Sequence, residues 1–569
     1  MAGLLAAGLA WRGCPPDESP EPRVSVEASP IRGGQLVASI RGEPRTFNRL
    51  AAVDQTTDLL ATLMQGRLVR VNRATFELEP WLAERWDSSP DGRTHTLHLR
   101  PGLEWSDGTP FTSADVLFSV RAVFDPVVGS AAASSLKVGG RAMEAAAPDD
   151  RTVVLTYAEP SGPGLRLLDM LPILPRHVLE PALEAGTLAD AWDATTPPGQ
   201  IVGMGPFLLR EYRPGERVVL ERNPRYWRTG PDGEPLPYLD RLILEIVPDQ
   251  NAELLRLQSG AIDLTNSELR ADDYLPVRRA EREGTLTMVE LGVSPDADGF
   301  WFCLKPEVKR ADPRFAFVRT REFRQAISHA VDREAFARTV FLGEAVPVWG
   351  PVTSGNRLWF SPNLPRYPHD LDRARALLAG IGLEDRDGNG VVEDAAGTEA
   401  RFTVITQRGI GYYERGTRVL AEQASLVGVA LDVVPLESGA MIKRLLACDY
   451  DAIYMRPLAS SLDPAGNPDY WLSSGSAHLW NMEQGKPATE WEARIDALMR
   501  EQARALDPLE RRTLFNEVQT VLAEQLPVLY FAAPRLYYAH NSRVRGVVPS
   551  VMRPPALWSA DTLSVTDAP

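Results

Sequence analysis

The stretch of sequence that decides the fold runs from residue 84 to residue 116 and reads ERWDSSPDGRTHTLHLRPGLEWSDGTPFTSADV. Each of its two Asp-Gly pairs is a turn signal, and residues 94–99 between them alternate in polarity as a half-buried strand does. Thr112 is a good helix N-cap with Asp115 three residues later, and apolar residues follow at helical spacing. The stretch therefore predicts a hairpin followed by a helix over 113–124.

Outward from this stretch, the pattern of the chain differs between its two halves. In the first half, a buried strand is predicted over 34–40 and a helix over 57–68. In the second half helices and strands alternate, with helices over 371–378, 417–427, 441–446, 491–505 and 508–526 and strands over 429–433, 452–455 and 528–532. Because helix-to-strand steps imply parallel pairing, we expect a doubly wound α/β lobe there.

Composition narrows the class of protein. The 569 residues include 44% apolar and 24% charged residues, which is ordinary for a globular chain. The net charge of −15 repels nucleic-acid phosphates, so nucleic acid is not an expected partner. No segment approaches 18 consecutive apolar residues, so the body of the chain is predicted to lie outside the membrane.

The three cysteines, Cys14, Cys303 and Cys448, cannot all pair, and none has the spacing of a metal site. Cys303 and Cys448 each lie in an apolar run, so both are predicted to be buried core thiols rather than a disulfide. Residues 1–13, MAGLLAAGLAWRG, form a short apolar stretch before Cys14, and a polar, Pro-rich stretch follows it. This arrangement resembles a bacterial lipoprotein signal and tether over residues 1–30, with Cys14 as the lipidation candidate.

Catalytic and metal-binding motifs are missing from the sequence. It contains no G-x-S-x-G elbow, no phosphate-binding G-x-x-x-x-G-K-[ST] loop, no H-E-x-x-H and no complete G-x-G-x-x-G. Residues 385–393, DRDGNGVVE, begin like a calcium loop, but the twelfth position is Ala396 where a bidentate carboxylate is needed. We therefore predict a polar turn there, no metal, no cofactor and no enzymatic activity.

The quoted stretch closely resembles the signature of the peptide/nickel-type substrate-binding proteins of ABC transporters, solute-binding protein family 5. Further matches follow in the family's order, and they extend the likeness over nearly the whole chain beyond Ile31. They are GMGPF at 203–207, ERNPRYW at 221–227, QSGAID at 258–263, RQAISHAVDR at 324–333, DRARALL at 372–378 and QLPVLY at 525–530.

The resemblance implies a two-lobed, periplasmic-binding-protein-like α/β fold of the class II type, with a hinge and a small extra domain in the first lobe. On that pattern residues 31–71, 198–288 and 526–560 form lobe I, residues 72–197 the extra domain, and residues 289–525 lobe II. The implied function is that of a monomeric, extracytoplasmic binding component, which captures a peptide or peptide-like small ligand between its lobes. Its partner would be the membrane permease of an ABC importer.

The resemblance also implies where ligand contacts lie. In peptide-binding relatives a carboxylate just before an Asp-Pro pair holds the ligand's amino group, but residues 455–462 before Asp463-Pro464 contain none. Asp463, or Arg456 facing an anionic group, would substitute. The other candidates lie in three places. They are Asp54, Gln55 and Thr56 of an early loop, Met204 and Gly205 of an inter-lobe loop, and Trp471, one of the aromatic residues concentrated in the second half.

Two kinds of alternative stay open at this point. The same fold serves a ligand sensor that signals to a membrane receptor, and it also serves importers of oligosaccharides, opines or nickel chelates. A secreted hydrolase on an unfamiliar scaffold is a different class of protein, which the missing nucleophile and metal patterns disfavour.

Overall fold

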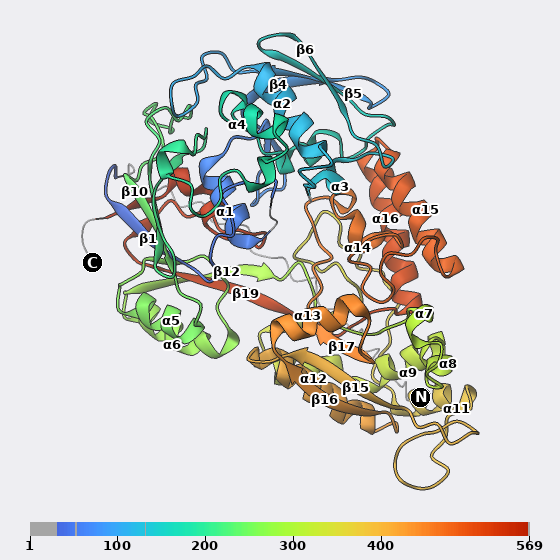
Figure 1. The fold of residues 1–569 in the computed structure, drawn as a ribbon. Coiled ribbons are helices and arrows are strands. Elements are labelled where there is room, and N and C mark those ends of the chain that lie inside the picture. Colours follow the sequence, from blue (N-terminus) through green and yellow to red (C-terminus); the bar gives the residue numbers. More distant parts are fainter. Residues whose placement is uncertain (1–30, 52–53, 131, 567–569) are drawn as a thin grey trace, which may run out of the picture.

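The structure is a computed structural model that describes residues 31–51, 54–130 and 132–566. The predicted signal segment and tether, with Cys14, lie outside these residues. Within the described ranges, no helix combines the length and the apolar character that a membrane span requires. The chain builds three parts, each around one main sheet (Figure 1). We call them lobe I, the extra domain and lobe II.

Lobe I is built on an eight-stranded sheet, in the order β12-β19-β11-β1-β10-β9-β8, with β14 on β19. Its strands are β1 (Gln35–Ile40), β8 (Phe207–Arg213), β9 (Arg217–Arg222), β10 (Arg241–Ile246), β11 (Leu264–Thr265), β12 (Leu286–Val293), β14 (Ala345–Pro347) and β19 (Ala532–Asn541). Helices α1 (Gln55–Met64), α5 (Gln250–Gln258) and α6 (Tyr274–Arg282) belong to this lobe, and β20 (Val544–Arg545) pairs with β21 (Ser564–Val565) near its carboxyl end. β1 pairs in parallel with β10 and β11, and β9, β10 and β8 form an antiparallel meander.

The extra domain is built on a four-stranded antiparallel sheet, in the order β4-β5-β7-β6. Its elements are β2 (Val69–Val71), β3 (Leu78–Pro80), β4 (Ala83–Ser88), β5 (Thr94–Leu99), α2 (Ser113–Phe124), α3 (Ala132–Leu136), β6 (Glu144–Asp149), β7 (Thr152–Thr156), η1 (Gly164–Met170) and α4 (Arg176–Glu184). Leu97 and Leu99 of β5 are buried, and Thr112 and Asp115 form a capping box at α2. The hairpin and helix predicted from the opening stretch are therefore confirmed.

Lobe II is built on a five-stranded sheet, in the order β16-β15-β17-β13-β18. Its strands are β13 (Gly299–Phe302), β15 (Arg401–Gln407), β16 (Ala430–Leu436), β17 (Ala452–Met455) and β18 (Leu529–Tyr530). Its helices are α7 (Pro306–Lys309), α8 (Phe315–Val318), α9 (Arg321–Ala330), α10 (Arg333–Val340), α11 (Leu371–Gly380), α12 (Gly411–Ser425), α13 (Ser438–Ala447), α14 (Pro468–Trp471), α15 (Glu490–Arg504) and α16 (Pro508–Gln525). Alternating residues of β13 lie on opposite faces, with Phe300 and Phe302 in one core and Trp301 in the other.

The predicted doubly wound arrangement describes only part of lobe II. β15 pairs in parallel with β16 and β17, as the alternation of helices and strands predicted. β13 and β18 add antiparallel pairing, so the sheet is mixed. The strand predicted over 528–532 is also shorter than expected, because the chain leaves lobe II after Tyr530 and continues as the ten-residue strand β19 of lobe I.

Two chain segments that run side by side join the lobes, and β14, which lies between α10 and α11 in the chain, pairs with the second of them at residues 532–534. One connects β12 to β13 and the other connects β18 to β19, and Figure 1 shows β12 and β19, from which the two segments extend, side by side. They are hydrogen-bonded to each other, with Ser294 N donating to Pro534 O at 2.7 Å and Asp298 N donating to Ala532 O at 3.1 Å. Two paired strands can bend together while each lobe keeps its own core, so this is where relative motion of the lobes would be accommodated.

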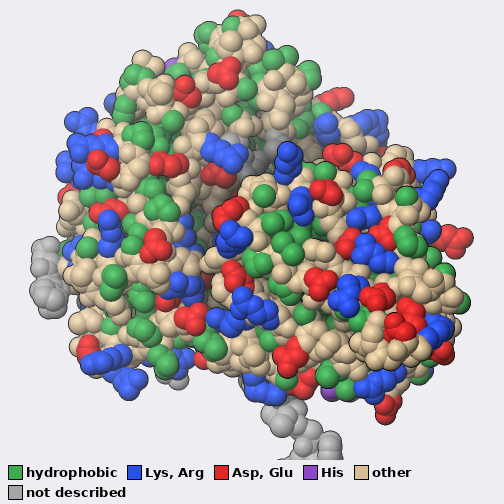
Figure 2. Space-filling view, turned by 60° about the horizontal axis from the view of Figure 1, so that its bottom comes forward, with side chains coloured by type: hydrophobic (Ala, Val, Ile, Leu, Met, Phe, Trp, Pro, Cys, Tyr) green, Lys and Arg blue, Asp and Glu red, His purple; other side chains and the backbone are tan. Residues whose placement is uncertain are grey.

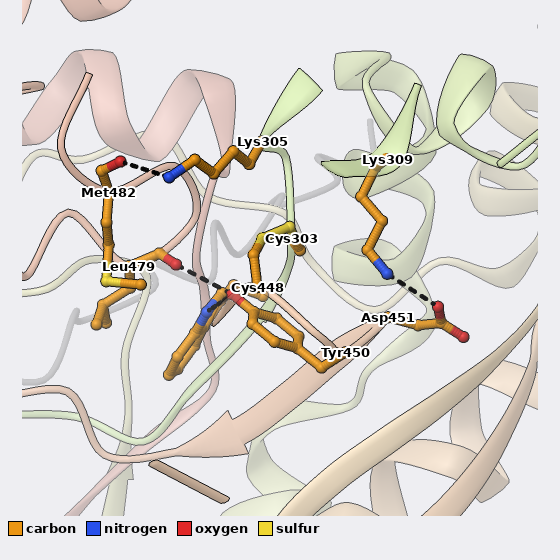
Figure 3. Close-up of a disulfide and its surroundings, with 9 residues drawn as sticks. Cys303, Lys305, Lys309, Cys448, Tyr450, Asp451, Leu479 and Met482 are labelled. Atoms are coloured by element: carbon orange, nitrogen blue, oxygen red, sulfur yellow. Dashed lines mark hydrogen bonds and ion pairs between the residues drawn. A yellow bond between two sulfur atoms is a disulfide. The ribbon is translucent and has the colours of Figure 1, made fainter. Parts of the chain in front are cut away.

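The prediction of two separate core thiols is wrong, because Cys303 and Cys448 form a disulfide in lobe II (Figure 3). The antiparallel pairing of β13 with β17 brings the end of one strand beside the start of the other. Cys303 directly follows β13, and Cys448 caps α13 in the left-handed conformation just before β17, with 5.9 Å between the two Cα atoms. Each cysteine does lie in an apolar run. Neither run indicates that strands separated by 145 residues pair and bring the two cysteines together.

Candidate ligand-binding site

A cavity of about 450 Å³ lies where lobe I, the extra domain and lobe II meet. Figure 2 shows the surface hollowed between the lobes, with basic and acidic side chains around the hollow. Side chains from α1 line one wall, η1 of the extra domain lines another, and the crossing segment and residues after β17 line the third. A cavity of this size suits a small molecule.

The α1 wall is fixed by a helix cap. Asp54 Oδ1 accepts from Thr56 N at 3.1 Å and Thr57 N at 3.0 Å, which begins the helix two residues before the predicted start. Gln55 lines the cavity. Thr56 instead turns inward, where its hydroxyl donates to Gly42 O at 3.1 Å. Of the three predicted residues in this loop, Gln55 is the one whose side chain faces the cavity.

A buried charge cluster that joins lobe I to the extra domain forms part of the cavity wall. Asp169 of η1 accepts from Arg73 Nη2 at 2.8 Å, Arg67 Nη1 at 3.3 Å and Val71 N at 2.9 Å. Burial alone would raise the pKa of Asp169, but the two arginines more than offset it and hold that pKa below its usual value. These charges satisfy one another and mainly fix the position of η1.

Four buried polar atoms of residues that line the cavity have no hydrogen-bond partner among the described residues: Asp58 Oδ1, which is ion-paired with Arg49, Gln65 Oε1, Arg166 Nη2 and Asn266 Oδ1. Arg166 of η1 donates through Nη1 to Phe76 O at 2.9 Å, while its Nη2 donates to nothing. Asn266 Oδ1 accepts no hydrogen bond either. Both residues line the cavity. Since buried polar groups are nearly always paired, an unused donor and an unused acceptor here are available to a ligand.

Asp296 lies on the crossing segment between β12 and β13 and lines the same cavity. Its Oδ1 accepts from Ala459 N at 3.0 Å and Ser460 N at 2.7 Å, which holds the segment after β17 against the crossing. Asp296 is only 8% exposed, and this burial raises its pKa to about 6 in spite of the two backbone donors. A cationic ligand group beside Asp296 would restore its full negative charge.

Arg456 lines the cavity from the end of β17. Its Nε donates to the fully buried Asp298 at 2.8 Å, and its guanidinium stacks over the Tyr412 ring at 5.3 Å. Burial would lower the pKa of Arg456, but the Asp298 carboxylate outweighs it and raises that pKa. Arg456 therefore keeps its charge, and Asp298 has already taken part of its hydrogen-bonding capacity.

Asp463 also lines the cavity, but both of its oxygens are engaged elsewhere. They accept from Arg511 Nη1 at 2.8 Å and Nη2 at 2.7 Å, and Oδ1 also accepts from Ala465 N at 3.0 Å. Asp463 and Arg511 are both almost fully buried. This bidentate pair anchors the segment after β17 to α16, so Asp463 is poorly placed to hold a ligand's amino group as well.

Three further predicted residues lie in cores and do not line this cavity. Met204 is 3% exposed in the core of lobe I, and Gly205 donates through its backbone to Met64 O at 2.9 Å. Trp471 is 2% exposed in a core of lobe II, with its ring edge-on to Phe515 at 5.0 Å. A ligand contact for these three stays a prediction, and it would need a movement that opens these cores.

The sequence reasoning did not single out Asp296, Arg166 or Asn266. No motif marks them, because each is brought to the cavity only by the meeting of separate parts of the chain. One local signal was available for Asp296: it belongs to the run SPDAD at 294–298, where two carboxylates directly follow the residues that form β12. Such a pair at a strand end is a reasonable candidate for a site.

Two lobes joined by paired crossing segments, with a polar cavity between them, define the class of two-lobed binding proteins. A family model described as "Bacterial extracellular solute-binding proteins, family 5 Middle" matches residues 77–478. The chain therefore belongs to the bacterial extracellular solute-binding proteins of family 5, and the two-lobed α/β fold that the sequence predicted is confirmed.

Individual relatives match over nearly the whole chain. A "Probable ABC transporter-binding protein" of Deinococcus radiodurans is 26% identical, covering 96% of this chain and 95% of the relative. The "Dipeptide-binding protein" of Escherichia coli is 25% identical, covering 92% and 93%. The solved oligopeptide-binding protein AppA of Bacillus subtilis, in complex with a nonapeptide, superposes with a TM-score of 0.72 at 22% identity, covering 95% of this chain and 100% of that one.

Proposed function

We propose that this protein captures a short peptide or a peptide-like zwitterion and delivers it, unaltered, to the permease of an ABC importer. The observation that carries the proposal is that one cavity holds two opposite charges on separate elements, Asp296 and Arg166, and that neither forms an ion pair with a described residue. A peptide carries an amino group and a carboxylate, which are the two groups that these side chains would recognise. The names of two similar proteins, for dipeptides and oligopeptides, support the same cargo.

In this proposal Asp296 takes the ligand's amino group and Arg166 takes its carboxylate. The planar guanidinium with a free Nη2 suits a carboxylate oxygen, and a buried aspartate gains most from a cationic partner. Asn266 Oδ1 then accepts from a peptide N–H. This assignment replaces the missing carboxylate before the Asp463-Pro464 pair with one that lies on the crossing segment.

Ligand capture would be coupled to closure of the lobes. Asp296 lies on the crossing segment, Arg166 in the extra domain and Gln55 in lobe I, so a ligand touching all three favours the closed arrangement. A shift of the population from 1:99 to 99:1 requires about 5.5 kcal/mol of extra binding to the closed form. Two charge-assisted hydrogen bonds at about 1.5–3 kcal/mol each supply most of that difference.

The lining disfavours oligosaccharide cargo. No Trp, Tyr or Phe side chain of the described chain lines this cavity, so there is no aromatic ring on which a sugar would stack. Trp471, the aromatic candidate from the sequence, is buried in a core of lobe II together with Trp301 and Trp480. Opines also carry an amine and carboxylates, so they form the nearest competing class of ligand.

A thermal-shift screen of the purified protein against peptides, oligosaccharides, opines and nickel chelates tests the proposal, because a ligand of the folded state raises the melting temperature. We expect free di- and tripeptides to raise it, and N-acetylated or C-amidated copies of the same peptides to lose the effect. Asp296→Asn and Arg166→Met should each reduce the shift sharply, with the exposed Asp449→Asn and Arg279→Met as matched controls. Equal shifts with capped and free peptides would refute the proposed anchors.

The fate of the amino terminus is a separate part of the proposal. We propose that the chain is exported and that Cys14 is the lipidated first residue of the mature protein, with the polar stretch after it as a tether. Palmitate labelling of cells that produce the wild type and Cys14→Ala tests this. Label in the wild type alone is expected, whereas equal labelling of both, or of neither, would contradict the assignment.

A further inference from the structure

The loop between α11 and β15 projects from the outer end of lobe II, remote from the ligand cavity (Figure 1). A backbone bridge closes the loop at its neck, with Glu393 N donating to Glu384 O at 3.0 Å and Glu384 N donating to Glu393 O at 3.1 Å. Val392 N also donates to Gly428 O at 2.9 Å, which ties the neck to the turn before β16. The neck therefore holds the loop firmly on lobe II.

Three carboxylates converge inside this loop. One oxygen from each of Asp385, Asp387 and Glu393 lies within 4.8 Å of the other two. Backbone donors set the two aspartates, since Gly388 N donates to Asp385 Oδ1 at 2.8 Å and Asn389 N donates to Asp387 Oδ1 at 3.0 Å. No Lys or Arg in the described part of the chain forms an ion pair with any of the three. Three like charges are thus held together without a protein cation to offset them.

Glu393 gives an independent sign that something is bound there. It is 7% exposed, and its Oε1 accepts from Arg386 N at 2.9 Å. Its Oε2 is buried and accepts no hydrogen bond from any described residue. A buried carboxylate oxygen without a donor is strongly disfavoured unless a cation takes the place of the donor. The nearby Arg386 guanidinium does not donate to this oxygen, since it donates to Gly382 O and to the Glu393 backbone carbonyl and forms an ion pair with Glu384.

We propose that Asp385, Asp387 and Glu393 bind one calcium ion. All three candidate ligands are carboxylate oxygens, which suit a hard cation, and no histidine or cysteine is present to favour zinc. The coordination of calcium is flexible and takes six to eight oxygens, so backbone carbonyls and water would complete it. Glycines at φ +77° (Gly388) and +86° (Gly390) let the chain turn tightly between the ligands.

This site differs from the calcium loop that the sequence of residues 385–393 resembles at its start. That pattern was set aside in favour of a polar turn because Ala396 stands at the twelfth position, where a bidentate carboxylate is required. In the structure the buried carboxylate comes from the ninth position, Glu393, which the neck bridge fixes beneath the two aspartates. The site would stabilise the loop of lobe II and would not take part in ligand capture.

Calcium titration of the full-length protein, stripped with EDTA and followed by calorimetry and melting temperature, tests the proposal. We expect one calcium ion per chain, a raised melting temperature, and a loss of affinity of about tenfold or more in Glu393→Gln and in Asp385→Asn/Asp387→Asn. Glu384→Gln removes a charge from the same loop without touching the three ligands, so it should bind as the wild type does. The exposed aspartates make the double variant safe for folding, which circular dichroism checks.

Two results would overturn the proposal. The first is the absence of heat and of any melting shift in the wild type up to about 10 mM calcium, roughly tenfold above the weakest class of extracellular sites. The second is calcium binding of unchanged affinity in both ligand variants, which would place the ion elsewhere, for example among the acidic residues of the cavity.

Discussion

Removal of the Cys303–Cys448 disulfide is expected to destabilise lobe II strongly. The bond closes a loop of 145 residues, which includes most of the lobe. In the chain-entropy model a loop of that length corresponds to about 5 kcal/mol at 25 °C, because the cross-link removes conformations from the unfolded chain. The 5.9 Å between the Cα atoms lies within the usual range for a disulfide, so the native backbone does not need to move to form it.

The assay is urea unfolding of the wild type and of Cys303→Ala/Cys448→Ala, each with and without a reducing agent. The wild type should lose several kcal/mol on reduction and then match the variant, while the variant should be indifferent to the reductant. Cys14→Ala serves as a control that removes a thiol from outside this bond. Two thiols at 303 and 448 that react freely in unfolded, oxidised wild-type protein would refute the reasoning, as would equal stability of wild type and variant under oxidising conditions.

Three other predictions concern the site and its supports. Asp463→Asn should cost about 3–5 kcal/mol of stability, measured by urea unfolding, because it leaves a buried arginine without its carboxylate. Peptide affinity should fall about tenfold from pH 7 to pH 5, because Asp296, with its pKa of about 6, loses its charge over that range; Asp296→Asn should flatten the dependence in calorimetry. Gly203→Ala should lower the melting temperature, at a cost of about 1–3 kcal/mol, because the new methyl group would meet Met64 O; Gly199→Ala, which has open space, should not.

The sequence predicted best those elements whose ends carry their own signals. The helix over 113–124 and the strand over 452–455 have the predicted bounds, since a capping box starts the first and turn residues flank the second. The helix predicted over 417–427 instead begins at Gly411. Its first turn buries Tyr413 but has no repeat of apolar residues at helical spacing, so the sequence pattern did not indicate it. β19 was missed because a strand that passes from one lobe to the other is specified by partners distant in the sequence.

The site was harder to predict than the fold for the same physical reason. Arg456 and Gln55 were singled out and do line the cavity, but Asp296 and Arg166 become neighbours of it only when three parts of the chain meet. The sequence likewise does not indicate which carboxylates are already paired with an arginine. Asp463 has its arginine on α16, whereas Asp296 has only backbone donors and keeps capacity for a ligand.

The central claim is that a zwitterionic ligand is enclosed between the lobes with its amino group on Asp296. A crystal structure of the protein with the best-binding peptide from the screen measures this directly. The account predicts peptide density in the cavity, the amino group within hydrogen-bonding distance of Asp296 and the carboxylate on Arg166. A peptide bound outside this cavity, or bound within it in the reverse direction without contact to either side chain, would contradict the account.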